Sequence, residues 1–271
     1  EAAIPVSCIQ YPESGRERRF AHKPPASQPR NVLVVGGGPA GMKTAAVAAE
    51  RGHSVALFEK CARLGGQVKL AQLLPGRSEF GGLVGNLERE LERAQVKVHR
   101  NVTVTESLVL EQAPDVVVVA TGSRPRTPSF AGADVANVVE PWQVITGEVS
   151  TGGSVLIADW ACDWVGLGLA EKLAREGCHV RLCATGMVPG ELIPQGVRDN
   201  WIGELHKLGV EIVPYARLFG ADEDSVYLQH VISEEPIIFE GVEALIPCIP
   251  QQSETGLSVG LESTGVATIS I

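Results

Sequence analysis

The chain has 271 residues, of which 44% are hydrophobic and 20% are charged, a composition that allows a large core or two globular domains. The formal net charge of −9 argues against binding to nucleic acid or to an anionic membrane surface. No apolar run approaches the roughly 20 residues that a membrane-spanning helix needs, so we expect no membrane partner.

The six cysteines show neither a C-x-x-C pair nor a disulfide-like spacing, which favours a reducing, cytoplasmic setting. The sequence carries no signal peptide, and because it begins at Glu1 rather than Met we expect Glu1 to be a cut end. Residues 1–30 are rich in proline and charge and lack periodicity. This composition predicts an extended linker in front of the first domain.

The stretch Asn31–Gly41 is an apolar strand that runs into a glycine-rich turn and then into an alanine-rich helix. Its glycines have the G-x-G-x-x-G spacing of a dinucleotide site. Gly36 permits the tight turn, Gly38 lets a pyrophosphate approach the backbone, and Gly41 lets helix and strand pack closely. The helix N-terminus offers unpaired N–H groups and a positive dipole end to the phosphates. The candidate phosphate-binding residues are therefore Gly36, Gly38, Pro39, Ala40 and Gly41.

A second predicted strand, Ser54–Phe58, leads directly into Glu59. This acid lies roughly 20 residues beyond the glycines, where a ribose hydroxyl is usually held. The segment Leu64–Gln67 follows, in which the glycines permit a close backbone approach and the glutamine can donate and accept hydrogen bonds. The alternative is a tight turn in another α/β fold, with Glu59 as a solvated acid. The candidate binding residues of this region are Glu59, Lys60, Gly66 and Gln67.

The next elements complete the pattern of a parallel sheet. Phe80–Arg93 predicts an amphipathic helix, and Val96–Val104 alternates like a strand whose last residue could offer its backbone to an adenine ring. The continuous valines of Asp115–Val119 predict a strand that is covered on both faces. The small residues that follow it let the backbone pass close to a cofactor. The candidates here are Val104, Ala120, Thr121 and Gly122.

The alternation of strand and helix restarts after a connector at residues 127–152. Strands are predicted at residues 153–157, 179–183, 210–213, 225–230 and 237–239, and helices at residues 165–176 and 201–208. The apolar run Gly241–Pro250 mirrors the earlier valine strand. The chain is therefore predicted to contain two copies of one doubly wound α/β plan.

The second copy has lost the features of a nucleotide site. If Gly166 takes the third glycine position, Ala161 and Asp163 take the first two, and the turn is longer by two inserted residues, Asp159 and Trp160. An aspartate at this place would repel a pyrophosphate, and a Cβ atom would obstruct its approach. Pro250 stands where the first copy has Gly122. We therefore expect the second domain to keep its fold but not its nucleotide.

These motifs together resemble the flavoproteins of the glutathione-reductase structural class, which have two dinucleotide-binding domains. The leading segment Cys8–Glu17, followed by a basic linker and the glycine motif, is similar to the trimethylamine dehydrogenase and 2,4-dienoyl-CoA reductase family of iron–sulfur flavoproteins. The run Trp164–Ala174 also resembles N-methylproline demethylases. The resemblance covers nearly the whole chain, but only the C-terminal part of the family's architecture. It implies an N-terminal TIM barrel that this chain lacks.

The resemblance implies a division of the chain into four parts. These are an iron–sulfur-segment remnant and linker at 1–30, an FAD- or ADP-binding domain at 31–150, a degenerate NAD(P)-binding-like domain at 151–250 nested in the first, and a truncated return strand at 251–271. Cys8 would be the last of four [4Fe–4S] ligands, in the full-length protein only. A plain thiol is the alternative for Cys8. The family's flavin-binding Gly-Asp would follow beyond Ile271.

The resemblance also implies what the parent protein does. The barrel would carry FMN and the small-molecule substrate, so no catalytic residue is expected in this chain, and the fragment alone is expected to be inactive. The degenerate second site favours an amine dehydrogenase or N-demethylase that passes electrons through the cluster to an electron-transfer flavoprotein. The alternatives are an NAD(P)H-dependent 2,4-dienoyl-CoA or enoate reductase, and a non-redox ADP-binding structural module. A homo-oligomer is left open.

Overall fold

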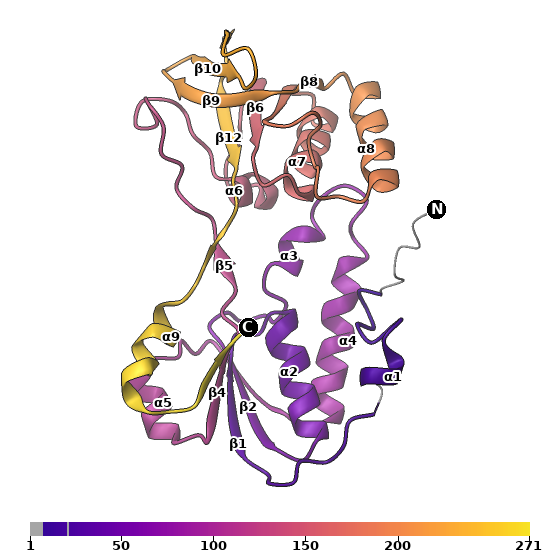
Figure 1. Cartoon of the computed structure of the whole chain (residues 1–271), viewed down its shortest axis with the longest axis vertical. Helices are drawn as coiled ribbons and strands as arrows, with labels where there is room; N and C mark the ends of the chain where they lie inside the picture. Colours follow the sequence, from indigo (N-terminus) through magenta and orange to yellow (C-terminus); the bar gives the residue numbers. More distant parts are fainter. Residues whose placement is uncertain (1–7, 21) are drawn as a thin grey trace. The chain divides into compact units, whose positions relative to one another are not determined.

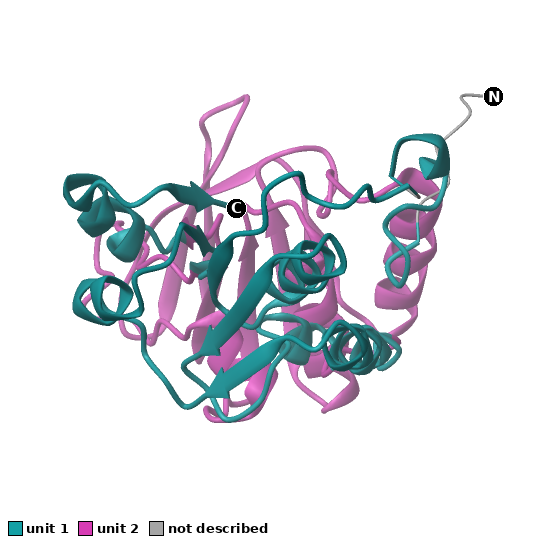
Figure 2. Cartoon of the chain, turned by 90° about the horizontal axis from the view of Figure 1, so that it is seen from below, with its two compact units in different colours: residues 1–72, 77–123, 253–271 teal, residues 73–76, 124–252 magenta. Residues whose placement is uncertain are grey.

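The computed structural model describes residues 8–20 and 22–271 of the chain. The chain divides into two compact units, drawn in different colours in Figure 2. Unit 1 comprises residues 1–72, 77–123 and 253–271, and unit 2 comprises residues 73–76 and 124–252. The chain leaves unit 1 within the short strand β5 (Ser123–Arg124) and returns to it within β13 (Gln252–Ser253).

Unit 1 is built on a five-stranded parallel sheet with the strand order β14-β4-β1-β2-β3, of which Figure 1 labels β1, β2 and β4. Its strands are β1 (Asn31–Val35), β2 (Ser54–Glu59), β3 (Lys97–Arg100), β4 (Val116–Val119) and β14 (Thr268–Ser270). The central strand β1 pairs with β2 on one side and with β4 on the other, and four of its five residues are buried. Such continuous burial is expected for a parallel sheet covered on both faces.

Helices cover both faces of this sheet. The helices α2 (Pro39–Glu50) and α4 (Phe80–Arg93) cover one face, where Met42, Leu87 and Leu91 pack against Val34 and Leu57. The helices α5 (Glu106–Gln112) and α9 (Gly256–Leu261) cover the other. The unit is completed by α1 (Glu17–Phe20), α3 (Val68–Ala71) and the 3-10 helix η1 (Glu262–Thr264). The predicted doubly wound α/β fold is therefore confirmed for this unit.

Unit 2 contains a four-stranded parallel sheet and a three-stranded antiparallel sheet. The parallel sheet has the order β12-β6-β7-β8 and consists of β6 (Ser154–Asp159), β7 (His179–Ala184), β8 (Glu211–Val213) and β12 (Ala244–Cys248). The antiparallel sheet has the order β11-β10-β9 and consists of β9 (Ala216–Ala221), β10 (Ser225–His230) and β11 (Pro236–Glu240). Its helices are α6 (Pro141–Thr146), α7 (Trp164–Arg175) and α8 (Gln195–Lys207).

Several boundaries differ from the sequence prediction. The expected strand at 96–104 is regular only over β3, and the expected helix at 201–208 begins earlier, at Gln195. The first domain was expected to run to residue 150, whereas residues 124–150 belong to unit 2. The physical reason is that this segment pairs with unit 2 strands through the bridges Ala131–Gly220 and Val138–Leu245. These contacts join residues about a hundred positions apart, so local sequence does not reveal them.

Candidate functional site

The turn between β1 and α2 is so tight that two of its glycines have no room for a side chain. Gly36 has a φ of +109°, and a Cβ atom on it would lie 2.2 Å from the carbonyl oxygen of Ala120. A Cβ atom on Gly41 would lie 2.0 Å from the carbonyl oxygen of Gly36. The turn, the first turn of α2 and the end of β4 are thus packed backbone against backbone. The roles predicted for Gly36 and Gly41 agree with this geometry.

Gly38 is different, because it faces open space. A Cβ atom on Gly38 would meet no atom within 4 Å, and its backbone is extended, with a φ of −75°. It is the N-cap residue of α2, no side chain caps the helix, and the first turn of α2 carries no acidic residue. The N-terminus of this 12-residue helix, with its positive dipole end, is therefore not capped by a side chain, and the Cβ position at its N-cap is open. A pyrophosphate fits such a cradle. Pro39 and the exposed Ala40 begin the helix there.

Glu59, at the end of β2, is buried and is bonded to the glycine turn. Its Oε2 atom accepts a hydrogen bond of 2.7 Å from the Gly37 N–H, and its Oε1 atom accepts one of 2.7 Å from the Cys61 N–H. A carboxylate has about four acceptor positions, so both oxygens can still accept from ribose hydroxyls. The adjacent Lys60 is exposed.

The segment after β2 folds back over the glycine turn. The Gly65 N–H donates to the carbonyl oxygen of Gly37 at 2.7 Å, and a Cβ atom on Gly66 would lie 3.1 Å from the Cα atom of Gly38. The side-chain amide of Gln67 donates to the carbonyl oxygen and to the hydroxyl of Ser123 at 3.1 Å and 2.9 Å. The structure thus joins this segment both to the glycine turn and to the residue that follows Gly122.

The Ala-Thr-Gly turn after β4 is held by the returning chain. The Ala120 N–H donates to the Val35 carbonyl at 2.8 Å, so this turn lies beside the glycine turn. The Thr121 hydroxyl donates to the carbonyl of Glu254 at 2.7 Å, and the Glu254 N–H donates to the carbonyl of Gly122 at 2.8 Å. These two bonds fix the Ala-Thr-Gly turn next to the cradle.

Val104 has a different setting from the other candidates. It lies four residues beyond the end of β3 and packs, partly buried, against the cluster that contains Val35, Phe58 and Val119. The segment after β3 is tied to β2, because the Val102 N–H donates to the Glu59 carbonyl at 3.0 Å. A contact between Val104 and an adenine ring stays a prediction.

The corresponding turn of unit 2, between β6 and α7, contains a carboxylate where unit 1 has its first glycine. Val32 pairs with Val55 and Val116, and Val155 pairs with Val180 and Ala244 in the same arrangement. Counting along the strands from this match aligns Gly36 with Asp159. The first glycine position therefore belongs to Asp159 and not to Ala161, as the sequence alignment had it. The two extra residues lie after Asp159, inside the turn.

Asp159 is fully buried and holds its own loop together. Its Oδ1 atom accepts a hydrogen bond of 3.1 Å from the Cys162 N–H, and its Oδ2 atom accepts one of 2.8 Å from the Gly190 N–H. A Cβ atom on Gly166 would lie 2.8 Å from Oδ1, so the carboxyl fills the space beneath the start of α7. Burial, mainly, raises the pKa of Asp159 to about 6; the charges of Asp163 and Glu191 add to this rise, and the two hydrogen bonds oppose it.

A second carboxylate occupies the N-terminus of α7. Asp163 is the N-cap residue, as the alignment with Gly38 predicts, and its Oδ1 atom accepts from the Val165 N–H at 2.8 Å. Burial raises the pKa of Asp163. The carbonyl of Cys248, at the end of β12, accepts from the Trp160 and Ala161 N–H groups at 2.8 Å and 2.7 Å. The donors that a pyrophosphate would need are thus used within the chain.

Sequence reasoning missed several members of these two sites. Contacts made by the backbone cannot be read from residue types. They include the N–H groups of Gly37 and Cys61, which bond Glu59, and the Ser123 carbonyl, which accepts from Gln67. Asp159 carried a signal, because it is the acidic last residue of an otherwise apolar strand, but the sequence alignment treated it as an inserted residue. Gly190 comes from a loop that no motif marks.

Two predictions concern features other than nucleotide binding. Among the described residues, no group of three or more His, Cys, Asp or Glu side chains is arranged to hold a metal ion. Cys8 is exposed, and its predicted role as a cluster ligand, which needs three further cysteines, is not tested. In the same part of the chain, no helix is both long and apolar enough to cross a lipid bilayer.

Comparison with known proteins places the chain in a family. Residues 30–246 match the family of pyridine nucleotide-disulphide oxidoreductases. The chain is 36% identical over 199 residues to N,N-dimethylglycine/sarcosine dehydrogenase of Chromohalobacter salexigens, a match that covers 70% of this chain and 29% of that protein. It is 39% identical over 179 residues to NADH oxidase of Thermoanaerobacter brockii, covering 65% and 28%. It is 38% identical over 176 residues to a probable N-methylproline demethylase of Rhizobium meliloti, covering 65% and 26%.

Among solved structures, the chain superposes on a 2-naphthoyl-CoA reductase with a TM-score of 0.87 and 25% identity, over 98% of this chain and 40% of that one. The chain thus spans less than a third of each of these three relatives and less than half of this structural neighbour. The predicted resemblance to the amine dehydrogenase and demethylase flavoproteins is confirmed. The chain belongs to the pyridine nucleotide-disulphide oxidoreductase family.

Proposed function

We propose that unit 1 binds the ADP moiety of FAD, or ADP itself, at the glycine turn. The pyrophosphate would lie against Gly38 and the N-terminus of α2, and Glu59 would accept hydrogen bonds from the ribose. A bound flavin would supply electron storage, and the residues of this chain would bind and orient it. The observation that carries the proposal is the open space at Gly38, between glycines that tolerate no side chain.

We further propose that unit 2 binds no pyridine nucleotide. Asp159 stands where the first glycine is needed, and Asp163 uses the helix N-terminus. A pyrophosphate in this turn would meet two carboxylates. At a few ångströms each like-charge contact costs about 1–4 kcal/mol, depending on screening. Unit 2 would then serve as a structural domain rather than as a binding site for NADH or NADPH.

For the parent protein we propose an FMN- and [4Fe–4S]-containing amine dehydrogenase or N-demethylase. Its relatives named as dimethylglycine/sarcosine dehydrogenase and N-methylproline demethylase act on N-methylated amines by name. The substrate, a small molecule, would be oxidised at FMN in the rest of the protein, and Cys8 would be one of the cluster ligands. Electrons would leave to an external acceptor such as an electron-transfer flavoprotein, in the cytoplasm.

The positions of the tryptophans allow the two units to be tested separately. All four, Trp142, Trp160, Trp164 and Trp201, belong to unit 2. We expect ADP and FAD to bind the chain in calorimetry, and ADP to leave the tryptophan fluorescence unchanged. With unit 1 saturated by ADP, NADH and NADPH should produce neither heat nor quenching. Quenching by either nucleotide would refute the proposal for unit 2, and absence of ADP binding would refute that for unit 1.

One relative favours a second candidate function, an NAD(P)H-dependent reductase. The NADH oxidase of Thermoanaerobacter brockii is as similar to the chain as the dehydrogenase is. The two candidates differ in whether reduced nicotinamide delivers electrons to the parent protein. Anaerobic mixing of the full-length parent with NADH or NADPH distinguishes them, because a dehydrogenase of the proposed kind keeps its flavin absorbance. Rapid bleaching of the flavin would favour the reductase.

A further inference from the structure

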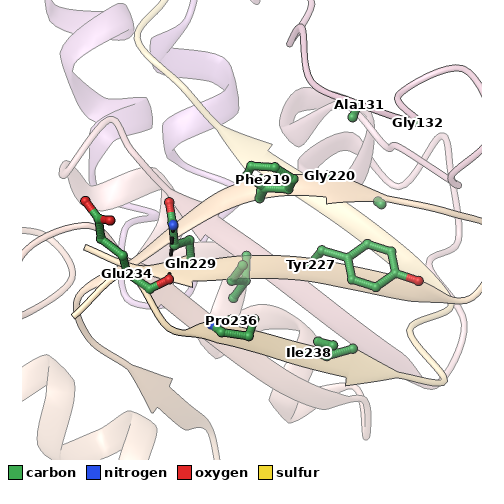
Figure 3. Close-up of a pocket in the computed structure, with 11 residues that line it drawn as sticks. Ala131, Gly132, Phe219, Gly220, Tyr227, Gln229, Glu234, Pro236 and Ile238 are labelled. Atoms are coloured by element: carbon green, nitrogen blue, oxygen red, sulfur yellow. Dashed lines mark hydrogen bonds between the residues drawn. The ribbon is translucent and has the colours of Figure 1, made fainter. Parts of the chain in front are cut away.

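The antiparallel sheet of unit 2 exposes an apolar face. Alternate residues of β9–β11 point into the core, among them Leu218, Val226 and Phe239. The opposite face carries Phe219 and Ile238, of which 67% and 54% is exposed. Figure 3 shows Phe219, Tyr227 and Ile238 on the neighbouring strands of this sheet. A sheet face of this composition is normally covered by another surface.

This face is hollowed into a groove of about 470 Å³. Its walls include Phe219, Tyr227, Pro236 and Ile238 on one side and the loop at Ala131 and Gly132 on the other. The apolar surface also extends past the groove, because Ile232, in the turn between β10 and β11, is 70% exposed. One drug-sized molecule would fill the groove but leave this extension uncovered, so the shape suits a polypeptide better than a small ligand.

We call the acidic residues of β9–β11 and of their turns the acidic rim; of these residues, Glu234 lines the groove. Between Ala216 and Glu240 the chain has six carboxylates and a single arginine. The guanidinium of Arg217 is held by the side-chain carbonyl of Gln229, at 3.1 Å and 2.6 Å. The carboxylates are Asp222, Glu223, Asp224, Glu234, Glu235 and Glu240. A second copy of the chain would bring the same negative charges to this face, which disfavours self-association through it.

We propose that this face is the docking site of a partner protein that presents an extended segment of basic and apolar residues. Its apolar side chains would pack on Phe219 and Ile238, and its basic side chains would face the acidic rim, with Glu234 at one end of the groove (Figure 3).

The test uses a fluorescein-labelled peptide, Lys-Arg-Val-Phe-Ile-Lys-Arg, and a version in which glutamate replaces every basic residue. Fluorescence anisotropy at low salt should show binding of the basic peptide alone, weakened by added salt. Phe219→Ser and Ile238→Thr should each weaken binding by about tenfold, because they remove apolar contacts at the centre of the site. Glu234→Gln should weaken it by a smaller factor.

The matched control is Leu110→Thr, because Leu110 is exposed to the same extent as Ile238, 54%, but lies in α5 of unit 1. This variant should bind the basic peptide as the unchanged chain does. Circular dichroism verifies that each variant is folded. The proposal is overturned if the basic peptide does not bind, if the acidic peptide binds equally well, or if the Phe219 and Ile238 variants keep full affinity. Self-association that sedimentation shows to disappear in Phe219→Ser would assign the face to a second copy instead.

Discussion

The N–H of Gly37 donates a hydrogen bond of 2.7 Å to Oε2 of Glu59, so the predicted ribose-binding carboxylate is also a structural member of the glycine turn. The other oxygen of Glu59 holds the Cys61 N–H. Neither contact needs a bound nucleotide. The turn is therefore preorganised by the same side chain that we propose as a ligand to the ribose.

Replacement of Glu59 by glutamine tests this double role. A glutamine side chain offers one carbonyl oxygen, so one of the two backbone N–H groups would face an amide NH₂ instead of an acceptor. A buried donor left without a partner costs about 1–3 kcal/mol. We expect the Gly37 or Cys61 amide to exchange hydrogen at least about tenfold faster in NMR, and ADP to bind more weakly. The exposed Glu111→Gln should change neither; unchanged exchange and affinity in Glu59→Gln would contradict the double role.

A pair of alanine substitutions separates binding from folding. Gly38→Ala adds a methyl group where no protein atom lies within 4 Å, so we expect a stability change within about 1 kcal/mol. The same methyl group intrudes on the pyrophosphate position and should weaken ADP binding at least about tenfold. Gly36→Ala places a methyl group 2.2 Å from the Ala120 oxygen at a positive φ, and should destabilise unit 1 by about 3 kcal/mol or more.

Thermal unfolding followed by circular dichroism, with calorimetry of ADP binding, distinguishes these outcomes. Full ADP affinity in a folded Gly38→Ala variant would refute the assignment of the pyrophosphate site. A Gly36→Ala variant as stable as the unchanged chain would show that the turn can relax, which its backbone contacts argue against.

The sequence was sufficient to predict the motifs that act locally. The glycine spacing and the valine strand before Ala120 both follow from runs of fewer than about 12 residues, and the structure agrees with each. The compact units place residues 124–150 in unit 2, whereas the sequence prediction counted them with the first domain. Their place in unit 2 depends on bridges to Gly220 and Leu245, which are far away along the chain.

The position of Asp159 shows the same limit at the level of one residue. The spacing to α7 suggested that Asp159 was part of an insertion. Only the pairing of its strand with β7 and β12 shows that Asp159 occupies the position equivalent to Gly36 in unit 1. Strand register is set by partners that sequence patterns of one strand cannot identify. The groove on β9–β11 was missed for a related reason. Alternation along a strand marks two faces, but not which neighbouring surface covers them.

Asp159 predicts a specific dependence of unit 2 stability on pH. Its pKa is raised from 3.8 to about 6 in the folded chain, so between about pH 4 and pH 6 the folded state binds more protons than the unfolded state. The free energy of unfolding should therefore fall as pH rises through this window, by about 3 kcal/mol from this group. Below about pH 4 the carboxyl is neutral in the folded chain, so there is no cost of burying a charge. Above about pH 6 the carboxylate is charged, and the free-energy cost of its burial no longer changes with pH.

Urea unfolding followed by tryptophan fluorescence reports on unit 2 alone, because all four tryptophans lie there. The difference in unfolding free energy between the unchanged chain and Asp159→Asn should change by about 3 kcal/mol between pH 4 and pH 7, whatever its absolute value. Glu223→Gln, an exposed control, should show a constant difference. A constant difference for Asp159→Asn would mean that its carboxyl titrates at its ordinary pKa.

The last prediction concerns thiol reactivity and locates the nucleotide without spectroscopy. Cys8 and Cys61 are exposed, whereas Cys183 and Cys248 are buried. Burial raises the pKa of Cys183 to about 12 and that of Cys248 well above its ordinary range, so neither forms the reactive thiolate near neutral pH. Iodoacetamide should therefore label Cys8 and Cys61 first, as peptide mass spectrometry can measure.

ADP should slow labelling of Cys61 several-fold and leave Cys8 unchanged, because the Cys61 N–H is bonded to the same carboxylate that we propose for the ribose. Equal labelling of Cys61 with and without saturating ADP would place the nucleotide away from Glu59.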